Sequence, residues 1–232
     1  MYLRSVLLVS IIATAMLSTC SKVAEPMNIT VDNLMVVLRE SIGTNKPDEL
    51  LKSMGTAKAK LANGKEIEIN PAWFQYIGDM HIRFVFDGPS SMQNATREDL
   101  ERLKLSPDEA LRIAVGNIKR VYGKPSSLPW VDVMQVKGSS PDLDSSYFLD
   151  REFWQDLLTQ HPEGVVAAVV KRGGLLYAPI SNAKAVEGLR RSVQPLYESS
   201  ENLRISSALF LFKDNKWSVY QAPKQTEVPP LQ

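Results

Sequence analysis

The stretch from residue 165 to residue 180, VVAAVVKRGGLLYAPI, constrains the fold more than any other part of the chain. Val165 to Val170 is apolar at every position, so a strand there would turn hydrophobic side chains to both faces, as a central strand does when each face is covered. Gly173 and Gly174 allow the positive φ of a tight reversal, after which Leu175 to Tyr177 can return antiparallel. The stretch predicts a buried hairpin inside a sheet.

Length and charge limit the class of protein. The 232 residues suffice for one large domain or two small ones, with a core that needs no metal or disulfide. The 27 basic and 26 acidic side chains give a formal charge of +1. A nucleic-acid surface built on bulk positive charge is therefore not expected. No sequence pattern indicates a cofactor.

The N-terminus has the pattern of an export signal. Arg4 precedes an uncharged, largely apolar run from residue 5 to residue 19, which is too short for a good membrane-spanning helix. Cys20, the only cysteine, follows Leu17-Ser18-Thr19, and this resembles the lipobox of bacterial lipoproteins. Lipidation at Cys20 would anchor the chain to a membrane of the cell envelope. Two alternatives stay open, namely ordinary signal cleavage, for example after the 13–15 Ala-x-Ala pair, and an uncleaved anchor.

Residues 27–222 are expected to form a single α+β domain, in which mainly antiparallel strands carry amphipathic helices. It follows a signal sequence and tether over 1–26 and precedes a disordered tail over 223–232. A Pro- and Ser-rich connector at 124–129 is the place where two lobes would meet. Helices are predicted at 32–42, from Pro47, at 96–103, at 106–123, from Asp150 and from Ser181 to about Pro195. Strands are predicted at 57–61 and 66–69 around Asn63-Gly64, and at 80–86, 130–136, 146–149, 208–212 and 217–220. Gly116, in the middle of a predicted helix, suggests close packing.

Segments 86–122 and 145–217 together resemble the uncharacterised bacterial family typified by the YtpQ protein. The resemblance rests on several short motifs in a matching order. They are Asp87 before Ser91-Met92, the Thr96-x-x-Asp-Leu helix start, Leu105-Ser-x-x-Glu-Ala-Leu, Ser146-Tyr-Phe-Leu, and VVAAVVKRGGLLYA, in which Arg172 fits a family arginine. The resemblance implies a common architecture and no particular chemistry.

The predicted strand at 80–86 presents the clearest group of polar side chains. Met80, Ile82, Phe84 and Phe86 would lie on one face, which leaves the opposite face polar. Asp79, His81, Arg83 and Asp87 would line that solvated face. Such a group can hold an anion or polarise a water molecule, and it can equally be an ordinary ion-paired sheet surface.

The sequence therefore supports three hypotheses of function. The leading one is a non-enzymatic, envelope-tethered binding or interaction protein, with His81, Arg83, Asp87, Ser91 and Arg172 as candidate ligand-binding residues and no catalytic set. A hydrolase-like enzyme using Asp79 and the Ser90-Ser91 turn together with His81, Arg83 and Asp87 is an alternative, and a structural envelope protein is another. His81 and His161 are too far apart in sequence to predict a metal site.

Overall fold

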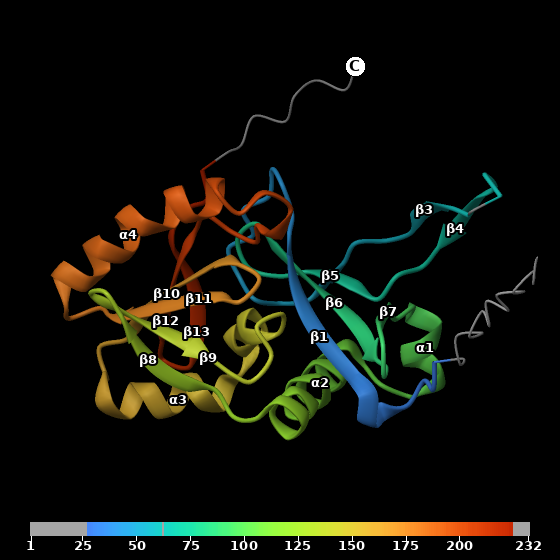
Figure 1. The fold of residues 1–232 in the computed structure, drawn as a ribbon, viewed down its shortest axis with the longest axis horizontal. Coiled ribbons are helices and arrows are strands. Elements are labelled where there is room, and N and C mark those ends of the chain that lie inside the picture. The colour runs from blue at the N-terminus through green and yellow to red at the C-terminus, as the bar shows by residue number, and fades with distance from the viewer. Residues whose placement is uncertain (1–26, 62, 225–232) are drawn as a thin grey trace, which may run out of the picture.

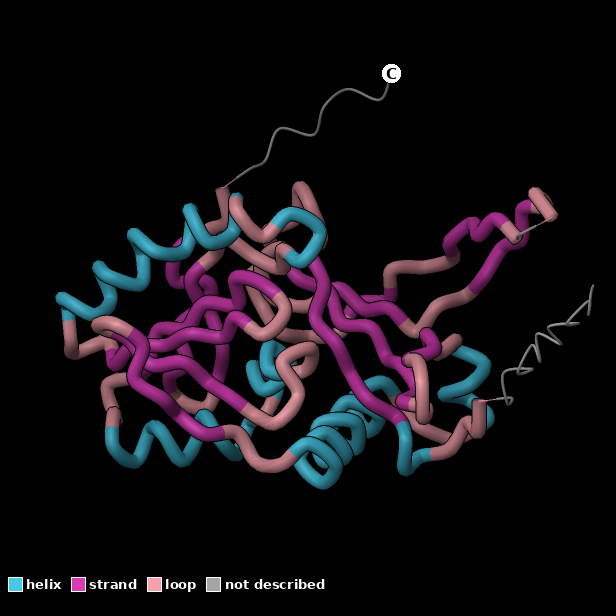
Figure 2. Tube along the Cα trace, in the orientation of Figure 1, coloured by secondary structure: helices cyan, strands magenta, loops and turns pink. Residues whose placement is uncertain are grey.

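A computed structural model describes residues 27–61 and 63–224. It confirms an α+β fold with antiparallel sheets (Figures 1 and 2). The predicted signal and lipidation at Cys20, and most of the predicted tail, lie outside the described residues.

The predicted central hairpin is confirmed and lies inside an antiparallel sheet, which has six strands. In their order across the sheet, the strands are β13 (Lys216–Gln221), β12 (Leu209–Lys213), β10 (Val165–Lys171), β11 (Gly174–Pro179), β9 (Val133–Lys137) and β8 (Ser126–Trp130). The segment 124–129, which we expected to be a connector, is mostly the edge strand β8, and the predicted strand at 130–136 is divided between β8 and β9. The closing hairpin of β12 and β13 is confirmed.

Both faces of the β10–β11 hairpin are covered, which explains its continuous apolar sequence. Val166, Ala168 and Val170 pack against helix α4 (Ala183–Glu198). Val165, Ala167 and Val169 face the main core on the other side. The sheet therefore lies between α4 and the rest of the molecule (Figure 1). α4 continues past Pro195, where we expected a bend or an end.

A second sheet is formed by the N-terminal half. Its path is β1 (Leu34–Glu40), β6 (Met80–Asp87), β5 (Trp73–Gln75) and β2 (Lys52–Ser53), and β7 (Met92–Asn94) pairs with the end of β6. The prediction of a helix at 32–42 is wrong, because this segment forms the 3-10 turn η1 (Val31–Asn33) followed by the strand β1. Leu34 to Leu38 is apolar without interruption and entirely buried, so it suits a strand covered on both faces. The helix predicted from Pro47 is also absent, and that segment leads into β2.

Among the described residues, side chains and not another strand hydrogen-bond the outer edge of β1. Asn117 Nδ2 donates to the carbonyl oxygen of Leu34 at 2.9 Å, and Ser146 Oγ donates to the carbonyl oxygen of Val36 at 2.8 Å. Buried backbone carbonyls need such partners. Asn117 comes from α2 (Pro107–Tyr122), and Ser146 comes from the 3-10 helix η2 (Asp144–Leu149). The segment 146–149 is therefore not the strand we predicted.

The helix starts that we predicted are confirmed at α1 (Arg97–Arg102) and α2. Thr96 and Ser106 each accept from the backbone N–H three residues on, and each helix has a capping box. α3 (Arg151–Gln160) also begins where expected, although the Asp150 side chain makes no cap hydrogen bond. Gly116 does not pack closely, because a Cβ there would meet nothing within 4 Å.

One hydrophobic core contains residues of both sheets, of α2, of η2 and of α3. Its centre is aromatic, with Phe148 stacked on Trp217 at 4.1 Å between ring centroids and Trp154 edge-on to Trp217 at 4.9 Å. The short hairpin of β3 (Ala57–Lys60) and β4 (Glu66–Ile69) reaches away from this body (Figure 1). A last 3-10 turn, η3 (Glu201–Leu203), hydrogen-bonds the β10–β11 turn through Leu203 and Arg172.

Candidate functional site

Strand β6 places His81 and Arg83 on the same sheet face, as predicted, but most of that face is buried and only Arg83 and Asp87 are half-exposed. His81 is only 3% exposed and Val85 only 5%. Trp73 lies opposite Arg83 in β5, and the Arg83 guanidinium carbon lies 3.9 Å from the centroid of the Trp73 ring. Arg83 Nε also donates to His81 Nε2 at 2.8 Å. The Arg83 side chain is therefore held between an aromatic ring and an imidazole.

Arg39 and Arg172 complete a group of three arginines, here called the arginine cluster (Arg39, Arg83 and Arg172). Arg39 lies in β1 directly opposite His81. β1 is the neighbour of β6, the strand that carries both His81 and Arg83. Arg172 occupies the turn between β10 and β11, where its backbone N–H bonds the carbonyl of Leu203. The three are close enough for their charges to interact. Burial first, and then the charges of Arg172 and Arg83, lower the pKa of Arg39 to about 10.

No ion pair neutralises the arginine cluster within residues 27–61 and 63–224. The Asp142 carboxylate is near enough to raise the pKa of Arg39, but this is the weakest of the four influences on that group. Arg39 Nη1 donates to the Leu38 carbonyl at 2.7 Å. The three arginines are half-buried and therefore present N–H donors and positive charge that no described residue pairs.

Trp73 adds an unpaired donor next to the arginine cluster. Its indole nitrogen Nε1 is buried and has no hydrogen-bond partner in the described part of the chain. A buried N–H without an acceptor costs about 1–3 kcal/mol. The Trp73 residue as a whole is half-buried, with Arg83 against its ring.

His81 is neutral and is not arranged as a general base. Burial, followed by the charges of Arg83 and Arg39, lowers its pKa to about 4. Because Nε2 accepts from Arg83, the proton of the neutral ring is on Nδ1, which lies 2.9 Å from Ser41 Oγ. The imidazole therefore donates to this serine and cannot withdraw its proton, as activation of a nucleophile would require.

The other predicted residues do not join this group. Asp79 is 5% exposed and accepts from Ser206 Oγ, and burial raises its pKa to about 6. Asp87 lies at the far end of β6, where it accepts from the Tyr122 hydroxyl at 2.6 Å. Ser90 and Ser91 are exposed in the β6–β7 turn. The expected line of Asp79, His81, Arg83 and Asp87 on one solvated surface is wrong, because Asp79 and His81 are buried and only Arg83 and Asp87 are half-exposed.

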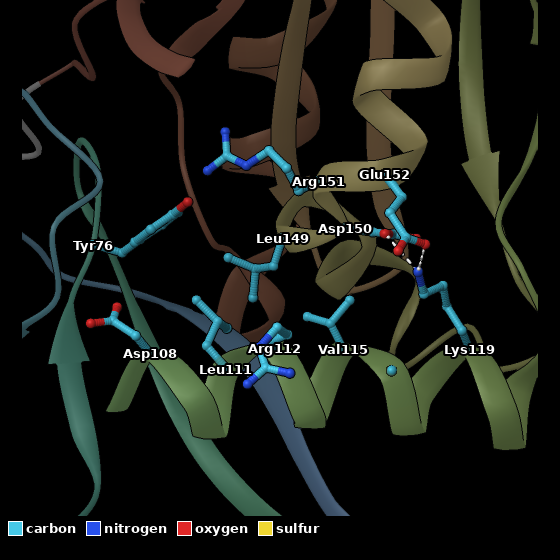
Figure 3. A pocket seen from close by; sticks show the side chains of 11 residues that line it. Tyr76, Asp108, Leu111, Arg112, Val115, Lys119, Leu149, Asp150, Arg151 and Glu152 are labelled. Atoms are coloured by element: carbon cyan, nitrogen blue, oxygen red, sulfur yellow. Dashed lines mark hydrogen bonds and ion pairs between the residues drawn. The ribbon is translucent and has the colours of Figure 1, made fainter. Parts of the chain in front are cut away.

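A separate cavity of about 370 Å³ lies between α2 and the start of α3 (Figure 3). Leu111, Val115 and Leu149 form its apolar part, and Gly116 lies in its wall. Most of its charged groups neutralise one another. Lys119 Nζ lies 3.0 Å from Asp150 Oδ1 and 2.7 Å from Glu152 Oε2.

Arg151 at the same cavity pairs with Glu49 at 2.6 Å, and the Tyr76 hydroxyl donates to that carboxylate as well. Space and apolar surface are available here, but its buried charges already have partners. The described residues contain no group of three or more histidine, cysteine or carboxylate side chains placed to hold a metal ion. The arginine cluster is therefore the stronger candidate for a binding site.

Sequence reasoning found Arg83, His81 and Arg172 but missed Arg39. A helix at 32–42 would have put Arg39 outside the apolar face of Leu34, Val37 and Leu38, on a solvated surface. The signal that could have found it is the unbroken apolar run of Leu34 to Leu38. That run has the same pattern as Val165 to Val170, which we interpreted as a strand.

No helix among the described residues has both the length and the apolar character needed to cross a membrane. Comparison of the chain with protein-family models, curated proteins and solved structures gives no significant match, so membership of the YtpQ-like family stays a prediction.

Proposed function

We propose that this chain is a non-enzymatic binding protein that holds an anionic ligand at the arginine cluster. The observation that supports this most directly is the presence of three neighbouring guanidinium groups without an ion pair in the described part of the chain. Each guanidinium offers a planar set of N–H donors that matches carboxylate or phosphate oxygens. A ligand anion would offset the mutual repulsion of the three charges.

The cluster is held in position before any ligand arrives. Arg83 is fixed by Trp73 and His81, Arg39 by the Leu38 carbonyl, and the Arg172 backbone by η3. Donors that are already ordered lose less conformational entropy on binding, which favours affinity. The hydrolase alternative has less support, because His81 donates to Ser41 and neither Ser90 nor Ser91 lies in the cluster.

Export and attachment to the cell envelope are part of the proposal and rest on the sequence of residues 1–26. Mass spectrometry of the mature N-terminus tests them, because a diacylglyceryl group on Cys20 is expected. A mature protein that retains residues 1–19 would contradict lipidation at Cys20, and one that is found in the cytosol would contradict tethering.

Arg172→Gln is the sharpest test of the binding site. This side chain has no hydrogen bond or ion pair to a described residue, so its replacement should leave folding intact. Inorganic phosphate, titrated calorimetrically at low ionic strength, should bind the wild type at least ten-fold more tightly than this variant. Arg112→Gln removes an exposed arginine of α2 and serves as the matched control, with unchanged affinity. Equal phosphate binding by all three proteins, or no binding by any, would refute the proposal.

A further inference from the structure

The cavity between α2 and the start of α3 has the size of a small-molecule binding site. Its volume of about 370 Å³ lies at the lower end of the range for such sites, which is about 300–1,000 Å³. Leu111, Val115 and Leu149 meet in its middle (Figure 3). Lys119 lies toward one end and Tyr76 toward the other. No residue of the arginine cluster lines this cavity.

Ion pairs at both ends of the cavity fix its walls. At one end, Lys119 of α2 pairs with Asp150 and Glu152 at the start of α3. At the other end, Arg151 of α3 pairs with Glu49, which lies in the segment before β2. The start of α3 is thus tied to α2 on one side and to the N-terminal half on the other. The space between the two helices is therefore a part of the fold.

Gly116 leaves one wall of the cavity without a side chain. It lies in the middle of α2, where glycine weakens a helix relative to alanine. Its helical backbone does not require glycine, and a Cβ there would meet nothing within 4 Å. Neither conformation nor packing within the chain therefore accounts for this residue. A ligand that lies against the bare helix wall does account for it, because a larger side chain would take up the same space.

The charged groups around the cavity are not available to a charged ligand. Lys119 and Arg151 are already paired with carboxylates, and the carboxylate of Glu152 is also 80% exposed to water. Asp108 and Arg112 are exposed, carry opposite charges and lie one turn apart on α2, so their charges offset each other. Among the described residues that line the cavity, no buried charge lacks a partner.

We infer that this cavity is a second binding site, which takes an uncharged, mainly apolar small molecule. The body of the molecule contacts Leu111, Val115 and Leu149 and lies against Gly116. Removal of apolar surface from water drives the binding. A charged molecule would give up its hydration in the apolar middle without gaining an opposite charge, so it is disfavoured. The site goes beyond the proposed anion binding and does not depend on it.

A fluorescence titration of the full chain with N-phenyl-1-naphthylamine tests this inference. The probe is uncharged, and its fluorescence rises in apolar surroundings. The wild type should bind it at a single saturable site. 1-Octanol should displace the probe at a concentration roughly ten-fold or more below that needed with octanoate or octylammonium, which have the same chain length and carry a charge.

Gly116→Phe places a ring against the cavity and should weaken probe binding by roughly ten-fold or more. Gly116→Leu repeats the test with a smaller side chain. Val121→Phe is the matched control, because it adds the same ring to an exposed position of α2 that does not line the cavity, and it should bind the probe like the wild type. Far-UV circular dichroism and urea titration establish that each variant is folded.

The inference is overturned if the wild type does not bind the probe, or if the folded Gly116 variants bind it as tightly as Val121→Phe. Displacement by octanoate or octylammonium at the same concentration as 1-octanol would overturn the uncharged class of ligand. Inorganic phosphate should bind Gly116→Phe and the wild type alike. Loss of phosphate binding together with probe binding would show an effect that is not confined to the cavity, and would contradict a separate site.

Discussion

Replacing His81 with glutamine should change how the stability of this protein depends on pH. Glutamine can still accept from Arg83, but it does not titrate. In the folded chain the pKa of His81 is lowered from 6.5 to about 4, mainly by burial and then by Arg83 and Arg39. As the pH falls, the imidazole of His81 takes up its proton in the unfolded chain before it does so in the folded chain. The stability that neutral His81 contributes is therefore lost as the pH falls from 6.5 through 4. The difference between these pKa values corresponds to about 3 kcal/mol in the free energy of unfolding.

Asp79 acts in the opposite direction over nearly the same range. Burial raises its pKa from 3.8 to about 6, so its contribution is full below 3.8 and is lost as the pH rises through 6. This effect is also about 3 kcal/mol. In the wild type the two groups therefore largely offset each other between pH 4 and 6. His81→Gln removes the pH dependence that His81 gives to the stability and leaves that of Asp79, and Asp79→Asn does the reverse.

Urea denaturation from pH 4 to pH 7.5 measures the result. His81→Gln should lose about 3 kcal/mol of stability, relative to its own value at pH 4, as the pH rises to 7. The asparagine of Asp79→Asn can still accept from Ser206. This variant should lose about 3 kcal/mol of stability as the pH falls from 7.5 to 4. The decisive quantity is the free energy of unfolding of the wild type minus that of the variant at each pH, because the other titrating groups contribute equally to both proteins. A wild-type-minus-His81→Gln difference that stays constant within about 1 kcal/mol across this range would refute the assigned ionisation states.

Three further predictions concern stability and use denaturant titrations at neutral pH. Gly116→Ala should stabilise the protein by up to about 1 kcal/mol, because the added Cβ meets nothing and alanine favours the helix. Gly78→Ala should instead destabilise the protein, because that glycine has a φ of +64° and a Cβ there would lie 2.8 Å from Phe210. Equal changes in stability for Gly116→Ala and Gly78→Ala would contradict this reasoning. Trp154→Ala should cost about 3–5 kcal/mol, because the ring is fully buried and Nε1 donates to the Tyr147 carbonyl; a cost below 1 kcal/mol would be inconsistent with this packing. Ser106→Ala should cost about 1 kcal/mol through loss of the α2 cap, and no change would contradict that role.

Local signals in the sequence were sufficient wherever neighbouring residues determine the structure. The Ser106-Pro107 start of α2 and the Gly173-Gly174 reversal are examples, because a cap and a turn act within a few residues. The helix predicted at 32–42 shows the limit. Leu34, Val37 and Leu38 satisfy helical spacing, but Met35 and Val36 between them are equally apolar. Pairing with β6 selected the strand.

The candidate site depends on long-range pairing to a greater degree. Arg39 meets His81 only through the register of β1 against β6, and Arg172 arrives from a turn of the other sheet. A period-two pattern identified the polar side of β6, but it could not show that the β10–β11 turn approaches the same place. The sequence therefore indicated single residues of the cluster and not their assembly.

The manner in which β1 is completed has a consequence for folding during synthesis. Ser146 follows Val36 by 110 positions, and α2, which supplies Asn117, also comes late. Until the ribosome has produced both, the apolar strand at the start of the domain lacks partners for its outer carbonyls. Closing so long a loop costs entropy before any contact is gained, so final docking of this strand should be slow. A newly made chain would then expose the apolar segment of β1 early in synthesis. Binding of a chaperone to this segment would prevent its aggregation.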